Sequence, residues 1–208
     1  MPPDRCELDD LLIERAKPYA NPPVVTALRG DAVVWSTRLK VSDQADLMPR
    51  MENPTIVAGH ILAKTDGEHT RGATSHDPRV HLLDRNGRVL WWKPWRLEGP
   101  VLSNQGDLVM LVMAAQYHLP VDTAQAWALR VRARDGRPLA MWPLQFSLET
   151  MQAFRKSSWP SMSGDLYRKG SSYYALLKAS WRGGEDKLKL RLEEPGERPT
   201  ADQRFKSS

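Results

Sequence analysis

The chain has 208 residues, 41% of them hydrophobic, which is enough to bury one sizeable core. Cys6 is the only cysteine, and this excludes an intramolecular disulfide and a cysteine-based zinc site. The net charge of +5 and the pI of about 9.4 describe a mildly basic protein, which permits an anionic partner without requiring one.

The N-terminal segment has a helical pattern. Leu8, Leu11, Leu12 and Ala16 recur at spacings close to a helical turn, with acidic residues early and basic residues late in the segment. Prolines at 18, 22 and 23 end this pattern. Residues 1–23 are therefore predicted to form a short helix and a proline linker.

Neither a signal peptide nor a membrane-spanning segment is visible. The N-terminus has no basic stretch followed by an apolar one, and no apolar run reaches the roughly 20 residues that a spanning helix needs. We expect a cytoplasmic protein without a membrane span.

From residue 24 to residue 194 the pattern changes to short apolar runs separated by Gly, Asn, Asp and Pro, which predicts an all-β antiparallel meander. Three phrases repeat within it, each an apolar strand, a glycine turn and a second strand that ends in Trp35, Trp91 or Trp142. Each phrase is typical of a β-hairpin. Their spacing of roughly 50 residues is in the range of propeller blades.

The strands around these phrases amount to about three blade equivalents in one β-rich domain, residues 24–194. A closed propeller has about four to eight blades. Three explanations stay open: part of a larger propeller, an open or oligomeric assembly, or another β-barrel or sandwich. We expect another protein chain or copy as a partner. Residues 145–156 suit a short amphipathic helix or another strand, and the polar residues 195–208 are predicted to be a disordered tail.

The phrase at 82–91, LLDRNGRVLW, resembles the repeat of the pyrroloquinoline-quinone-type (PQQ-like) β-propellers, with Asp84, Gly87 and Trp91 in the family's order. Weaker copies follow that pattern with Asp135, Gly136 and Trp142, and with Gly30 and Trp35. The resemblance implies that each tryptophan packs between blades and each glycine forms the hairpin turn. The PQQ-like family includes both quinone-dependent dehydrogenases and non-enzymatic scaffolds. Because this chain has few strands and no adjacent cysteine pair, we expect no cofactor.

Residues 66–81 are rich in potential metal ligands. His69, His76 and His81 stand among carboxylates and glycines, and imidazole and carboxylate groups bind zinc and similar ions. Their spacing matches no common ligand framework. A metal site and a solvated loop are both compatible with this pattern.

Two predicted strands carry alternating cations, namely Arg130, Arg132 and Arg134 on one and Lys187, Lys189 and Arg191 on the other. A period of two places each set on one face of its strand. If the strands share a sheet face, the six cations form a stripe that suits phosphates. The alternative is that each set is the solvated side of a half-buried strand.

Aromatic residues and cations also cluster at 91–96. Adjacent Trp91 and Trp92 point to opposite faces of a strand, so Trp92 and nearby Trp95 are the candidates for an aromatic binding surface rather than for the core.

No nucleophile motif stands out. The preferred hypothesis is a non-enzymatic binding or scaffold module that mediates protein–protein interaction. The alternatives are a polyanion-binding protein for nucleic acid, acting through the basic strands, and a metal-assisted hydrolase built on the histidines.

Overall fold

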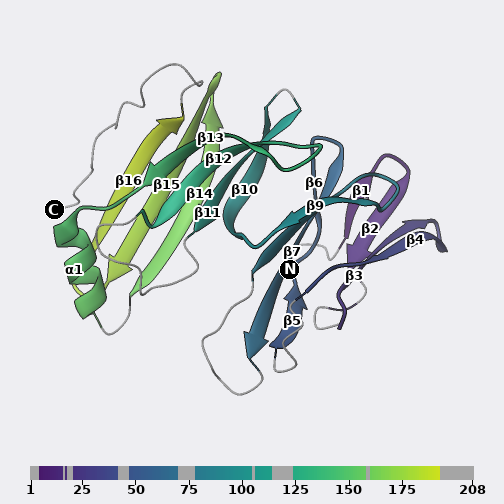
Figure 1. Cartoon of the computed structure of the whole chain (residues 1–208), viewed down its shortest axis with the longest axis horizontal. Helices are drawn as coiled ribbons and strands as arrows, with labels where there is room; N and C mark the ends of the chain where they lie inside the picture. Colours follow the sequence, from purple (N-terminus) through teal and green to yellow (C-terminus); the bar gives the residue numbers. More distant parts are fainter. Residues whose placement is uncertain are drawn as a thin grey trace. The chain divides into compact units, whose positions relative to one another are not determined.

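A computed structural model of the chain describes residues 5–15, 17, 21–41, 47–69, 78–104, 106–113, 124–157 and 160–192, without the side chains of 47–48 and 67–69. The described residues form four antiparallel sheets and one short helix (Figure 1). The predicted all-β, propeller-like fold is confirmed. The chain divides into two compact units, which we describe separately.

Unit 1 comprises residues 1–96 and the turn 133–136. Its first sheet has the order β1-β2-β3-β4, with bounds Arg5–Leu8, Leu11–Arg15, Val24–Arg29 and Ala32–Arg38. Its second sheet has the order β5-β7-β8-β9, with bounds Leu47–Met51, His60–His69, Arg79–Leu83 and Val89–Lys93, and β6 (Thr55–Val57) pairs with β7. Apolar side chains of both sheets form one core cluster, among them Ile13, Val25, Met51, Ile61 and Leu83.

The predicted N-terminal helix is wrong, because these residues form the hairpin of β1 and β2. Asp9 has a φ of 54°, which makes the tight turn that reverses the chain between Leu8 and Leu11. Leu11 and Ile13 are buried in the core cluster of unit 1, whereas Leu12 between them stays partly exposed. The helix-like spacing arises because the turn interrupts an alternating strand pattern.

Unit 2 comprises residues 97–132 and 137–208. Its two sheets are β10-β11-β12-β13 and β14-β15-β16. The bounds are Arg96–Asn104, Asp107–Met113, Ala126–Arg132 and Pro138–Leu144 for the first, and Ser161–Lys169, Ser172–Trp181 and Gly184–Leu192 for the second. Buried residues of both sheets and of helix α1 share one core, including Leu111, Trp142, Phe154, Leu166 and Leu177.

The segment between these sheets is a helix rather than a strand. α1 spans Leu148–Lys156 and begins at Ser147, whose side chain accepts a hydrogen bond from the backbone N–H of Thr150. The hydroxyl of Thr150 donates to Asp186 Oδ2 of β16 at 2.6 Å, which ties the helix to the last sheet. Within the described residues no helix is long and apolar enough to cross a membrane.

The strand count differs from the expected three blade equivalents. The N-terminal hairpin supplies β1 and β2 to a complete first sheet, and β14–β16 form a fourth sheet. The single domain at 24–194 stays a prediction, and the predicted disordered tail at 195–208 lies outside the described residues.

Candidate functional site

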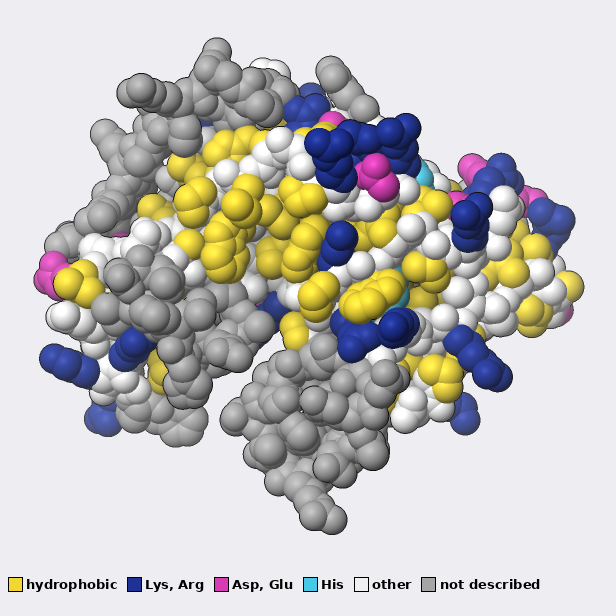
Figure 2. Space-filling model, viewed as in Figure 1, with side chains coloured by type: hydrophobic (Ala, Val, Ile, Leu, Met, Phe, Trp, Pro, Cys, Tyr) yellow, Lys and Arg dark blue, Asp and Glu magenta, His cyan; other side chains and the backbone are white. Residues whose placement is uncertain are grey.

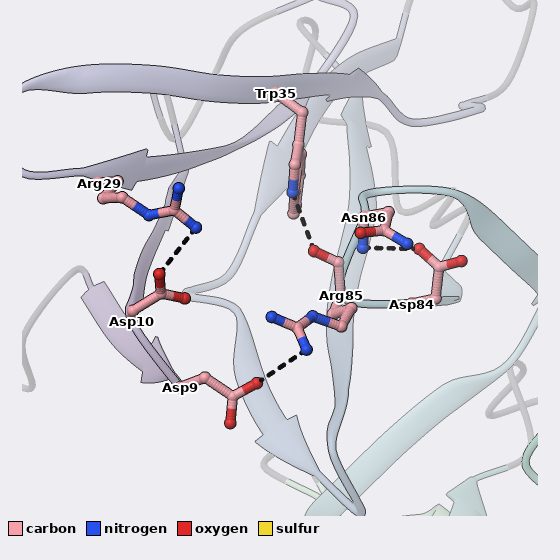
Figure 3. A network of polar contacts seen from close by, with 7 residues as sticks. All are labelled: Asp9, Asp10, Arg29, Trp35, Asp84, Arg85 and Asn86. Carbon is pink, nitrogen blue, oxygen red and sulfur yellow. Dashed lines mark hydrogen bonds and ion pairs between the residues drawn. The ribbon is translucent and has the colours of Figure 1, made fainter.

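Trp35 contacts the turn of the next sheet. Its indole Nε1 donates to the carbonyl of Arg85 at 3.0 Å (Figure 3). The Thr37 hydroxyl donates to the carbonyl of Gly87 at 2.6 Å. A Cβ at position 87 would lie 2.5 Å from Trp35 Cε3, so only glycine permits this approach. The carboxylate of Asp84 shapes the turn by accepting from the backbone N–H groups of Asn86 and Arg88, both at 2.9 Å.

Trp91 makes the corresponding contact one repeat later. Its Nε1 donates to the carbonyl of Ala133 at 2.6 Å, and a Cβ at Gly136 would lie 2.7 Å from Trp91 Cδ2. Trp91 is 7% exposed. Trp35 and Trp91 therefore join successive repeats, and they are packing residues rather than a ligand surface.

Trp92 lies on the opposite face of β9 from Trp91, next to buried His81 at a ring separation of 6.4 Å. Arg79 and Lys40 lie over its ring, 4.8 and 5.4 Å from the centroid. Cations so placed interact with the negative face of the indole. The ring of Trp92 is thus partly covered by the chain's own side chains.

Trp95 is also engaged within the chain. Its ring meets Trp91 edge-on at 6.4 Å, and Lys93 lies 5.9 Å from its centroid. Both Trp92 and Trp95 are partly exposed, so the aromatic binding surface stays a prediction.

Of the three histidines predicted as metal ligands, only the side chain of His81 is described. It is fully buried, and its Nε2 lies 3.0 Å from the carbonyl of Lys40, which fixes this nitrogen as the donor. Its Nδ1 has no hydrogen-bond partner among the described residues. Burial is the main reason that the pKa of His81 falls to about 4.

The side chain of His69 and all of His76 lie outside the described residues. Among the residues that the structure does describe, no group of three His, Cys, Asp or Glu side chains could hold a metal ion. The metal site therefore stays a prediction.

The two basic triplets lie on different sheets. Arg130 and Arg132 are on β12, whereas Lys187, Lys189 and Arg191 are on β16. Arg130 Nε contacts Asp107 Oδ2 at 3.0 Å, and both side chains are largely buried. Arg134 is in the turn that belongs to unit 1, where it is 76% exposed and pairs with Asp135 at 3.7 Å.

The last sheet brings the second triplet together with two tyrosines. Tyr167 of β14 and Tyr174 of β15 are cross-strand partners, and their rings stack at 5.4 Å with an angle of 14°. Lys189 of β16 lies 4.8 Å from the centroid of Tyr174 and 5.7 Å from that of Tyr167. Arg191 pairs with Tyr174 across the strands and is exposed. We call these four residues, with Lys187, the tyrosine–lysine face.

One carboxylate organises the end of this face. Glu185 contacts Lys178 at 2.6 Å and Lys187 at 2.8 Å. Hydrogen bonds from these two lysines lower the pKa of Glu185 to about 2. Lys178 and Lys187 are thus partly neutralised within the sheet.

The pairing of the two tyrosines depends on the turn between β14 and β15, which the sequence marks with a glycine. The turn at Gly170 pairs Lys169 with Ser172, and this register places Tyr167 opposite Tyr174.

On the face of the molecule in Figure 2, Lys and Arg side chains of the described residues form separate groups with hydrophobic side chains between them. The predicted stripe of six cations is not a single sheet face.

No protein-family model and no curated protein matches the chain. Among solved structures it is similar to a europium-containing methanol dehydrogenase, at 15% identity and a TM-score of 0.46 over 70% of this chain and 25% of that one. It is also similar to a GH43 endo-arabinanase from Bacillus licheniformis, at 8% identity and a TM-score of 0.43 over 97% and 73%. It is similar as well to a glycoside hydrolase, at 9% identity and a TM-score of 0.37 over 96% of this chain and 47% of that one.

The chain thus spans a quarter of the dehydrogenase's length and about half of the glycoside hydrolase's length. These likenesses carry no argument about activity or ligand. Membership of the PQQ-type family stays a prediction, because no family model matches.

Proposed function

We propose that the protein is a non-enzymatic binding module that holds an acidic segment of a partner protein on the tyrosine–lysine face. The observation that carries this proposal is Lys189 lying over two stacked tyrosines on a half-exposed sheet face. Tyrosine and arginine are enriched in protein interfaces, where they combine large contact areas with polar ends. Arg191 adds an exposed charge beside the rings.

The charge balance favours an acidic protein segment over a polyphosphate chain. Glu185 already pairs with two of the lysines, and Asp165 of β14 lies on the same face, opposite Leu176. A polyphosphate would meet these carboxylates at close spacing. A short acidic segment can place its charges at Lys189 and Arg191 and lay apolar side chains on the tyrosines.

The test measures binding of fluorescently labelled poly-L-glutamate at low salt to the full chain and to Lys189→Glu/Arg191→Glu. Reversal of two face charges is expected to weaken binding by about tenfold or more, since close charge pairs across an interface are strongly coupled. Arg38→Glu, an exposed position on β4 of unit 1, is the matched control, and its effect is expected to be less than twofold. Tyr174→Ala is expected to weaken binding without changing the net charge.

Single-stranded oligonucleotide and heparin are measured in parallel. Tighter binding of either than of poly-L-glutamate, with the same dependence on Lys189 and Arg191, would support the polyanion-binding alternative instead. Equal losses in the face variant and in Arg38→Glu would show non-specific attraction and overturn the proposal, as would no binding of any probe at low salt.

A further inference from the structure

Two tyrosines of the last sheet are held ring against ring. Tyr167 of β14 and Tyr174 of β15 are direct cross-strand partners, and their ring centroids lie 5.4 Å apart with an angle of 14° between the ring planes. Side chains opposite one another in an antiparallel pair start from Cβ atoms about 5 Å apart. The backbone pairing of the two strands therefore keeps these rings together.

Both rings are accessible from solvent. Tyr167 and Tyr174 are partly exposed, and neither hydroxyl has a hydrogen-bond partner among the described residues. The neighbouring Tyr173 points to the other face of β15, where it is 8% exposed in the core and its hydroxyl donates to the carbonyl of Ser103 at 2.9 Å. Water can therefore accept a phenolic proton from the two stacked tyrosines, whereas Tyr173 is shielded.

Two neighbouring phenols can be joined by one-electron oxidation. A tyrosine that loses one electron and its phenolic proton becomes a phenoxyl radical, whose unpaired electron is shared with the two ring carbons next to the hydroxyl carbon. Two such radicals combine by forming a carbon–carbon bond between these positions, and each ring becomes aromatic again when the hydrogen on the bonded carbon moves to the oxygen. A haem peroxidase passes the two electrons and two protons to one hydrogen peroxide, which becomes two water molecules. The crosslinked chain is two hydrogen atoms lighter.

The fixed position of the rings selects the product. A radical on an isolated surface tyrosine has to meet a second chain, so its coupling slows on dilution. Radicals on paired rings need no encounter, because a bimolecular step has become a unimolecular one. We propose that Tyr167 and Tyr174 form an oxidation site at which one-electron oxidants of the haem-peroxidase class produce an intramolecular dityrosine crosslink between β14 and β15. This crosslink needs no partner protein and is independent of the function proposed for the tyrosine–lysine face.

The test treats the full chain with a haem peroxidase and hydrogen peroxide and follows the monomer by intact mass and by the blue fluorescence of dityrosine. A monomer lighter by two hydrogen atoms is expected, with a yield per chain that does not change on dilution. Trypsin is expected to release residues 157–168 and 170–178 as one crosslinked pair of peptides. Oxidation of the exposed Met141 adds an oxygen atom, so it changes the mass in the opposite direction.

Phenylalanine variants assign the two ends of the crosslink. Tyr167→Phe and Tyr174→Phe keep an aromatic ring at each position and remove only the hydroxyl, so both are expected to fold and to lower the yield of crosslinked monomer by about tenfold or more. Tyr173→Phe is the matched control, because Tyr174 is then the only tyrosine of the 170–178 peptide. Its yield is expected to equal that of the unsubstituted chain.

Three results would overturn the proposal. One is a treated monomer without dityrosine. Another is a full yield of crosslinked monomer in Tyr167→Phe or Tyr174→Phe. The last is a crosslink that joins only separate chains and disappears on dilution. Binding of poly-L-glutamate is measured without oxidant, and the crosslink is measured without poly-L-glutamate, so the two proposals fail separately.

Discussion

At the scale of single residues, the glycines of the hairpin turns differ in what surrounds them. Gly30, Gly87 and Gly136 all have positive φ, at 58°, 79° and 65°. An added Cβ at Gly30 meets nothing within 4 Å, whereas at Gly87 and Gly136 it would overlap a tryptophan ring. A substituted side chain would therefore strain the backbone at all three positions, but it would overlap a tryptophan ring only at Gly87 and Gly136.

This difference predicts the outcome of alanine substitution. Gly30→Ala incurs only the cost of the left-handed conformation, about 1 kcal/mol. Gly87→Ala also forces the Trp35 ring away and weakens its hydrogen bond to Arg85, so it is expected to lower the free energy of unfolding by about 1–3 kcal/mol more. Urea unfolding of the two variants measures the difference, and equal destabilisation would contradict the described contact.

The buried imidazole of His81 predicts a pH dependence of stability. Its pKa is lowered to about 4 in the folded chain from 6.5, chiefly by burial. Between these values the unfolded chain holds a proton that the folded chain does not, so folding is favoured at high pH and disfavoured as the pH falls. We expect the stability that His81 confers to be complete above pH 6.5 and about 3 kcal/mol lower at pH 4.

Urea unfolding between pH 4 and 8 checks this, with His60→Gln as the control at a partly exposed histidine. His60→Gln is expected to keep the slope and His81→Phe to flatten it. The NMR titration of the His81 ring in the unsubstituted protein gives a second measure that does not depend on the variant folding. A midpoint near 6.5 would show that the imidazole is solvated.

At the scale of elements, the N-terminal hairpin shows why local pattern misleads. A helix would place Leu8, Leu11 and Leu12 on one stripe, but the tight turn at Asp9 and pairing with β3 bury Ile13 and leave Leu12 partly exposed. The turn has no glycine to announce it, and the pairing partner lies beyond a linker rich in proline. The hairpins at Asn86-Gly87 and Asp135-Gly136 were predictable because their turns are local signals.

The hairpin makes a prediction that a helix would not. Ile13→Ala removes a fully buried side chain and is expected to cost about 2–5 kcal/mol of unfolding free energy. Leu12→Ala is expected to cost less than about half of that. Thermal or urea unfolding of both variants decides between the elements, since comparable losses would favour a buried helical stripe.

At the scale of the whole molecule, the fold class could be predicted from the sequence, because alternating apolar runs and glycine turns repeat along the chain. The number of sheets could not be predicted, because the first sheet begins with the hairpin of β1 and β2, whose residues have a helix-like spacing. The tyrosine–lysine face was predicted in part. Lys187, Lys189 and Arg191 follow a period of two, but the tyrosines join them only through the register of β14 with β15. Arg130 lies in a different sheet from these three residues, because sheet membership depends on long-range strand pairing.

The contacts of the repeat tryptophans also have a direction along the chain. Trp35 precedes its carbonyl partner by 50 residues, and Trp91 precedes its partner by 42. Because proteins are made from the N-terminus, each of these indoles leaves the ribosome before the turn that receives it. A ribosome that pauses between a tryptophan and the turn to come therefore leaves a large aromatic ring uncovered, and chaperone binding to the nascent chain should be strongest in those intervals.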